Sequence, residues 1–254
     1  MINFFRKIRK KMADDNKPTK YMRYAIGEIV LVVIGILIAL QINNWNEDRK
    51  QDNRKKEVTQ SLILELNEVL SYTRDQVRMM GDRIETYSKI LNKWETYDPK
   101  SLSKDSLKRY YWLIHTSSIL KYNPRVGYYN SLINSGEINL ITDSLVIKLN
   151  YIYDKHRKDL VTYVDQEADL HVLIAEIVAR NHPKIFLSAT KSEDRFGSMD
   201  VASTINFLNS VKGDGELKSL IFRNLFIIQM KQFLLTERVI PDLNYMLENF
   251  KSGS

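Results

Sequence analysis

The chain has 254 residues, a formal net charge of +7 and no cysteine, with 44% hydrophobic and 27% charged residues. This composition excludes disulfide-stapled, collagen-like and low-complexity proteins, and the hydrophobic fraction is high enough to bury a core. Without cysteine the chain has no thiol nucleophile, thiolate metal site or redox pair.

The positive charge is concentrated at the N-terminus. Residues 1–23 contain eight basic and two acidic residues, whereas residues 46–254 contain 30 basic and 28 acidic residues. A nucleic-acid-binding domain spreads lysine and arginine over a folded face, while a short basic block beside an apolar run is typical of membrane orientation. We therefore predict no nucleic-acid partner. Residues 1–23 are interpreted as a basic cytoplasmic tail, which is either amphipathic and bound to the inner leaflet or simply solvated.

An apolar segment follows the tail. Residues 25–42 read AIGEIVLVVIGILIALQI and carry a single charge, and with Tyr24 and the polar flank to Trp45 the segment reaches 22 residues. A helix of this length matches a hydrocarbon core of about 30 Å, so residues 24–45 predict a transmembrane helix that anchors the chain in a lipid bilayer. The run is too long for a signal peptide and too uniformly apolar for a buried helix. The excess of basic residues before it predicts a cytoplasmic N-terminus and an external C-terminal part.

Two features within this segment are candidates for function. Glu28 is an ionisable group in a membrane span, and is either a coupling carboxylate or a group near the cytoplasmic end that reaches the headgroups. Gly27, Gly35 and Ala39 are spaced by eight and four residues and share one helical face. Small residues on one face let two membrane helices approach closely, so this face predicts helix association.

Three sequence blocks carry a resemblance to a known family. They are MINFFRKIRKKM at 1–12, YAIGEIVLVVIGILIALQINNWNE at 24–47 and YYNSLINSGEINLITDSL at 128–145. Together they resemble an uncharacterised family of single-pass inner-membrane proteins from Gram-negative bacteria, classed as a domain of unknown function. The resemblance implies an inner-membrane protein with a helical periplasmic part, and it implies no activity.

The remainder of the chain predicts an all-α fold. Residues 46–250 are interpreted as one periplasmic helical bundle, and residues 251–254 as a tail that is either native or introduced by cloning. A long first helix to about residue 97 carries an apolar repeat of roughly 3.5 residues. This repeat either packs against other helices of the chain or forms a coiled coil with a second copy, and enough helix follows to cover it within the chain. Its positions are Leu62, Leu66, Val69, Thr73, Val77, Met80, Ile84, Tyr87, Leu91 and Trp94.

Helix signals recur along the rest of the chain. A second helix is predicted at 105–120, and Asn123 followed by Pro124 predicts the start of a short helix that Gly136 ends. A long helix is predicted from residue 142 or 143 to just before residue 182. Polar residues 184–200 predict an irregular segment. The last helices are predicted at 201–211, at 216–237 and to residue 250, with Pro241 opening or kinking the final one.

The chain contains none of the common catalytic motifs. GxGxxG, GxxxxGKS/T, GxSxG and HExxH are all absent. Glu167 and His171 lie four residues apart on one helical face and form the best start of a metal site, but such a pair is also common as a solvated face or a weak ion pair. We nominate no catalytic, cofactor-binding or metal-binding residue.

Aromatic residues gather in the middle third of the chain. Tyrosine combines a broad apolar ring with a polar tip, which suits protein interfaces and equally the solvated edge of a helical core. The candidate interaction surface consists of Tyr110, Tyr111, Trp112, Tyr128 and Tyr129.

We predict a membrane-anchored periplasmic adaptor or scaffold that is not an enzyme. Its predicted partners are the lipid bilayer and either a second copy of the chain or another envelope protein. Two alternatives stay open. One is a sensory, ligand-binding helical bundle, which would signal through a partner because the cytoplasmic tail is too short for a signalling domain. The other is a single-span subunit of an ion-driven envelope machine that uses Glu28.

Overall fold

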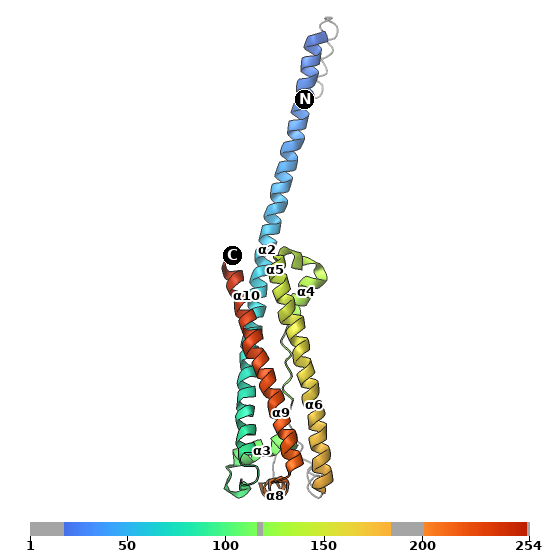
Figure 1. The fold of residues 1–254 in the computed structure, drawn as a ribbon. Coiled ribbons are helices and arrows are strands. Elements are labelled where there is room, and N and C mark those ends of the chain that lie inside the picture. The colour runs from blue at the N-terminus through green and yellow to red at the C-terminus, as the bar shows by residue number, and fades with distance from the viewer. Residues whose placement is uncertain (1–17, 116–118, 184–200, 253–254) are drawn as a thin grey trace. The chain divides into compact units, whose positions relative to one another are not determined.

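The computed structural model describes residues 18–115, 119–183 and 201–252, which form helices and loops but no strand (Figure 1). The all-α prediction is therefore confirmed for these residues. The chain divides into two compact units, residues 1–58 and 59–254, which are described separately below. The predictions for the amphipathic tail up to residue 17, for the polar segment 184–200 and for residues 253–254 lie outside the described residues.

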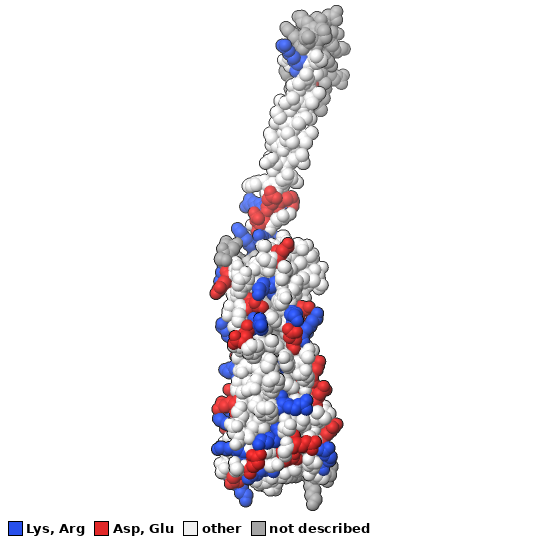
Figure 2. Space-filling view, in the orientation of Figure 1, with Lys and Arg blue, Asp and Glu red and all other residues white. Residues whose placement is uncertain are grey.

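The described part of the first unit is one uninterrupted helix. It is the N-terminal part of α2 (Pro18–Asn92), and almost every side chain from Met22 to Glu57 is exposed. Among the described helices, α2 is long and apolar enough to cross a membrane, by length and composition. Figure 2 shows an almost uncharged surface along this apolar stretch, with charged groups before and after it.

The second unit contains the rest of α2 and the later helices that the structure describes. After the long helix come a 3-10 turn (Pro99–Ser101), α3 (Lys104–His115), α4 (Gly127–Ser135), a second 3-10 turn (Glu137–Leu140) and α5 (Asp143–Asn150). A π-helical turn (Tyr151–Lys155) joins α5 to α6 (His156–Asn181). They are followed by α8 (Val201–Val211), α9 (Gly215–Leu234), a π-helical turn (Leu235–Val239) and α10 (Ile240–Ser252).

The core of the second unit lies between α2, α6 and the α9–α10 pair. Figure 1 shows these long helices running alongside one another, and side-chain hydrogen bonds join α9 to both α2 and α6. The apolar repeat of α2 faces this core: eight of its ten predicted positions are buried, while Val77 and Ile84 are partly exposed. The repeat is therefore covered by helices of the same chain, and the coiled-coil interpretation has no support at this seam.

The start of α4 is fixed by a residue far away in the sequence. Both carboxylate oxygens of Glu65, on α2, accept backbone hydrogen bonds, from the N–H groups of Tyr128 (2.7 Å) and Tyr129 (3.0 Å). These are two of the N–H groups that lack a partner within the first turn of a helix. The predicted start at Asn123 and Pro124 is wrong, because this remote carboxylate sets the first turn three residues later.

The end of α4 follows the local prediction. Gly136 adopts φ 75°, a left-handed conformation that glycine reaches without steric strain, and its N–H bonds to the carbonyl of Ile133. The chain then turns into α5, which begins at Asp143 as predicted.

Pro241 lies within the first turn of the last helix and does not end it. A proline ring has no N–H and crowds the carbonyl four residues earlier, so a regular α-helix is disturbed there. The π-helical turn Leu235–Val239 lies directly before it, and the N–H of Ile240 bonds to the carbonyl of Leu235. The helix thereby continues from α9 into α10.

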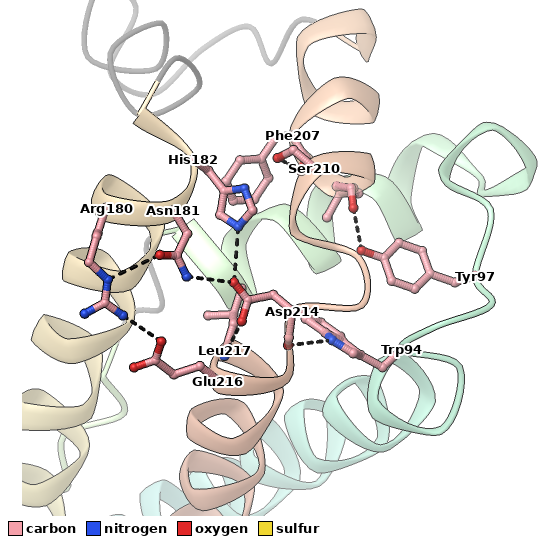
Figure 3. A network of polar contacts seen from close by, with 11 residues as sticks. Trp94, Tyr97, Arg180, Asn181, His182, Phe207, Ser210, Asp214, Glu216 and Leu217 are labelled. Atoms are coloured by element: carbon pink, nitrogen blue, oxygen red, sulfur yellow. Dashed lines mark hydrogen bonds and ion pairs between the residues drawn. The ribbon is translucent and has the colours of Figure 1, made fainter.

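A polar network fastens one end of this unit (Figure 3). Asp214 caps α9 through a bond from the N–H of Leu217 (2.9 Å), and its other carboxylate oxygen accepts bonds from Asn181 (3.1 Å) and His182 (3.3 Å) at the end of α6. The backbone oxygen of Asp214 accepts a bond from the indole N–H of Trp94 (2.9 Å). One residue therefore joins α9 to the end of α6 and to the loop after α2.

Candidate functional site: a phenylalanine stripe on helix α9

Three phenylalanine side chains lie in a line on the outer face of α9. Phe222, Phe226 and Phe233 are 62%, 56% and 51% exposed, and exposed Gln229 lies between the second and the third. At 100° per residue these four positions fall within about 60° of one another around the helix axis. We call them the α9 stripe.

The opposite face of α9 is held by buried polar residues. Asn224 and Lys231 are fully buried and lie about half a turn from the stripe. Asn224 Nδ2 is 2.9 Å from the hydroxyl of Tyr87 on α2 and 3.1 Å from Nε2 of His171 on α6. Lys231 Nζ donates to the backbone oxygen of Leu120 at 2.8 Å.

The strongest of these contacts is an ion pair. Lys231 Nζ lies 2.6 Å from Oε2 of Glu167 on α6, and neither side chain is exposed. The other carboxylate oxygen, Oε1, is 4.0 Å from Nη1 of Arg83 on α2 and 4.0 Å from Nε2 of His171. The Glu167 carboxylate therefore faces two cationic side chains, Arg83 from α2 and Lys231 from α9.

Burial and the nearby positive charges together determine the protonation of His171. Burial, followed by the positive charges of Arg83 and Lys231, lowers the pKa of His171 from 6.5 to about 4, so its imidazole is neutral at pH 7. Burial also lowers the pKa of Lys231, although the Glu167 carboxylate opposes this effect. The group formed by Arg83, Glu167, His171, Asn224 and Lys231 is called the ionic cluster below.

The ionic cluster is not fully satisfied. Glu167 Oε1 and Asn224 Oδ1 are buried and accept no hydrogen bond. Unpaired buried acceptors reduce what a cluster contributes to stability, and replacing one member of a buried pair is strongly destabilising. The arrangement therefore specifies which face of α9 points inward more than it stabilises the unit.

Comparison with known proteins places the chain in a family. A model described as "Family of unknown function (DUF6090)" matches residues 28–213, which is well over half of the sequence. The chain belongs to the DUF6090 family. No curated protein and no solved structure matches the chain. This match confirms the resemblance to an uncharacterised family. The matched region begins inside the apolar segment of α2 and ends one residue before Asp214.

The predicted aromatic surface needs correction. Tyr110 and Tyr129 are 8% and 7% exposed, so they pack in the core of the DUF6090 chain and offer almost no surface. Tyr111 and Tyr128 are partly exposed, and Trp112 is 37% exposed. The rings are buried because they pack on one another and on neighbouring helices, as Tyr129 does on Tyr153 with ring centres 4.4 Å apart.

The predicted residues in the first unit have open surroundings. A Cβ atom placed on Gly27 or Gly35 would meet no heavy atom within 4 Å, and Ala39 is exposed. Glu28 is partly buried in the same helix. Among the residues that the structure describes, none packs against this small-residue face.

Glu167 and His171 are brought together, but as part of an ion-pair cluster. The ammonium group of Lys231 takes one carboxylate oxygen, at the distance given above. Among the described residues, no group of three histidine, aspartate or glutamate side chains is placed to hold a metal ion. The i, i+4 spacing of Glu167 and His171 indicated that they share a helical face. It did not indicate that Lys231 on α9 lies opposite that face.

The α9 stripe was not predicted from the sequence. The segment LIFRNLFIIQMKQFLL is apolar on nearly all sides, so periodicity alone does not separate its inner face from its outer face. Arg223, Gln229 and Lys231 interrupt this run, but the first two are exposed and the third is buried, so they do not mark one common face. Lys231 marks the inner face only once its partner Glu167 is known.

The ionic cluster predicts strong coupling between Glu167 and Lys231. Replacing Glu167 with Gln leaves Lys231 buried without its counter-ion. Lys231→Met leaves the Glu167 carboxylate with the more distant Arg83, at 4.0 Å, in place of the cation at 2.6 Å. Each single change should lower the free energy of unfolding by about 3–5 kcal/mol, and the double variant should recover at least about 2 kcal/mol of the sum. Urea denaturation of the detergent-solubilised chain measures these values.

The matched control is the exposed pair of Asp154 and Lys158, which are 2.8 Å apart. The corresponding Asn and Met variants should each change stability by less than about 1 kcal/mol. If the Glu167 and Lys231 variants also changed the free energy of unfolding by less than about 1 kcal/mol each, and their effects were additive, the two residues would not be coupled as the ionic cluster requires.

The lowered pKa of His171 predicts acid sensitivity. Because the unfolded imidazole binds a proton near pH 6.5 and the folded one near pH 4, stability should fall as the pH drops through this window. After a discount for partial solvent screening we expect a loss of about 2 kcal/mol. Denaturation curves between pH 7 and pH 4 check this, and His171→Gln should flatten the dependence. An unchanged slope in that variant would assign the acid sensitivity to other groups.

Proposed function

We propose that this chain is a membrane-anchored helical adaptor of the cell envelope. In this proposal the apolar part of α2 crosses a bilayer, and the unit from residue 59 onward binds another protein. The single observation that carries the binding role is the α9 stripe, because three half-exposed phenylalanines in one line form a surface that water solvates poorly.

The exposure of the apolar part of α2 supports the anchor. Ile29, Leu31 and Ile42 are each more than 60% exposed, and their neighbours in the segment are exposed as well. Leaving one such side chain in water forfeits about 1.5–3 kcal/mol of burial energy, so a run of them favours a lipid environment. The family match includes the segment from residue 28 onward, which favours a permanent anchor over a leader that is removed.

The proposed orientation follows from the flanking charges. Eight basic residues precede the span, and the basic residues that follow it alternate with acidic ones. The positive-inside bias favours a cytoplasmic N-terminus and an external, periplasmic helical unit. The proposal requires no catalytic residue and no cofactor.

The anchor predicts a membrane-bound chain with an external C-terminus. We expect the chain to stay in the membrane fraction after alkaline carbonate washing, and a C-terminal alkaline phosphatase fusion to be active. Replacing Val33 and Ile36 together with Arg places two charges at the centre of the apolar run, and should remove the chain from membranes. Recovery of the unaltered chain in the soluble fraction would contradict the anchor.

The binding role predicts that the stripe is needed for contact and not for folding. The triple variant Phe222→Ser, Phe226→Ser, Phe233→Ser should lose crosslinks to its partner, measured in native membranes with a photoreactive residue at position 229. Because all three side chains are more than half exposed, each change should alter stability by only about 0.5 kcal/mol.

Val172→Ser on α6 is the matched control, since Val172 is 58% exposed on a different helix. It should leave the crosslinks unchanged. Equal crosslinking in the triple variant, or a large loss of stability, would overturn the binding role of the stripe.

A further inference from the structure

We infer that the α9 stripe binds the same stripe of a second copy of this chain, with the two α9 helices parallel and Gln229 opposite Gln229. This inference rests on the proposed function, because it names the partner of the surface proposed there. It is independent of whether the assembled pair also holds a third protein.

The spacing of the stripe is that of a helix–helix seam. Phe222, Phe226, Gln229 and Phe233 are separated by four, three and four residues, which is the a/d spacing of a coiled coil. Such a seam of about three turns fits the matching seam of another helix, since side chains at these positions insert between those of the partner. The inward face of α9 is already occupied, so the stripe alone is left for this role.

The charges around the stripe allow two copies to approach. Between Phe222 and Phe233 the charged residues are Arg223 and Lys231. Lys231 is buried and paired with Glu167, whereas Arg223 is exposed and lies about 100° around the helix axis from Phe222. Lys218, near the start of the helix, is paired with Glu95 at 2.6 Å. Like charges facing each other across a symmetric contact are destabilising, and the four stripe positions themselves carry none, while Arg223 lies beside the stripe.

Gln229 favours the parallel arrangement. In a parallel pair it faces its own copy, and each amide donates to and accepts from the other. In an antiparallel pair it faces Phe226, which leaves a buried amide without a partner. A single polar residue in an apolar seam is a known means of fixing register and orientation.

The size of the stripe sets the strength of the contact. Three half-exposed phenylalanines offer on the order of 300 Å² per chain, well below the roughly 800 Å² per partner of a stable interface. The contact is therefore weak in dilute solution. Anchoring both copies in one membrane raises their effective concentration, and the small-residue face of Gly27, Gly35 and Ala39 offers a second contact between the same two chains.

Disulfide crosslinking tests the inference directly, because the chain has no cysteine of its own. Gln229→Cys and Phe226→Cys, each in the full chain in native membranes, should give disulfide-linked dimers on mild oxidation. Val172→Cys and Leu64→Cys are the controls, since both positions are more than half exposed on other helices. The stripe variants should give at least about five times as much dimer as the controls.

Each outcome decides between the two proposals. If the stripe variants give no more dimer than the controls, the pairing of two copies is wrong. If crosslinks form only between a Phe226→Cys chain and a Gln229→Cys chain, the two helices are antiparallel and the inferred parallel pairing is wrong. If a photoreactive residue at position 229 then captures a different protein, the adaptor function stands and only the second copy is wrong. If it captures nothing, the adaptor function fails as well.

Discussion

The buried ion pair between Glu167 and Lys231 is the contact on which the orientation of α9 depends. It joins α6 to α9 at 2.6 Å, and both side chains are fully buried. A buried lysine without a counter-ion is strongly unfavourable, so rotating α9 about its axis would break the pair and leave two charges in an apolar core. No apolar residue of the helix imposes a comparable constraint, because leucine, isoleucine and phenylalanine can replace one another inside at modest energetic expense.

The exposed phenylalanines follow from this constraint. With Lys231 and Asn224 turned inward, the positions half a turn away must face outward, and three of them are Phe222, Phe226 and Phe233. A sequence selected only for the stability of the isolated unit would carry polar residues there. Because charge fixes the inner face of α9, packing within the chain does not explain the three outward phenylalanines. Contact with another molecule explains them better.

The parts of the fold that sequence patterns predicted are those set by local chemistry. The glycine end of α4 at Gly136, the start of α5 at Asp143 and the break between the helices ending at Val211 and beginning at Gly215 each depend on residues within one or two helical turns. The start of α4 was misplaced because Glu65, which caps it, lies 63 residues before Tyr128. The burial of Tyr129 was missed for the same reason, since its partner ring belongs to Tyr153 on another helix. Non-local contacts of this kind leave no periodic signal in a single sequence.

The candidate site illustrates the same limit. The i, i+4 pair of Glu167 and His171 was visible in the sequence, and so was the lone lysine in an apolar run, but nothing in either pattern relates them to each other across 64 residues. Once the pair is known, it assigns the inner face of α9 and thereby its outer face. A small outer surface of three aromatic rings binds effectively only if its partner is held nearby. Under the proposed anchoring, a shared membrane would hold two copies close together without strengthening the contact itself. In the proposed function the anchor and the stripe depend on each other, because a surface too small to bind from dilute solution would be large enough to bind between molecules confined to the same bilayer.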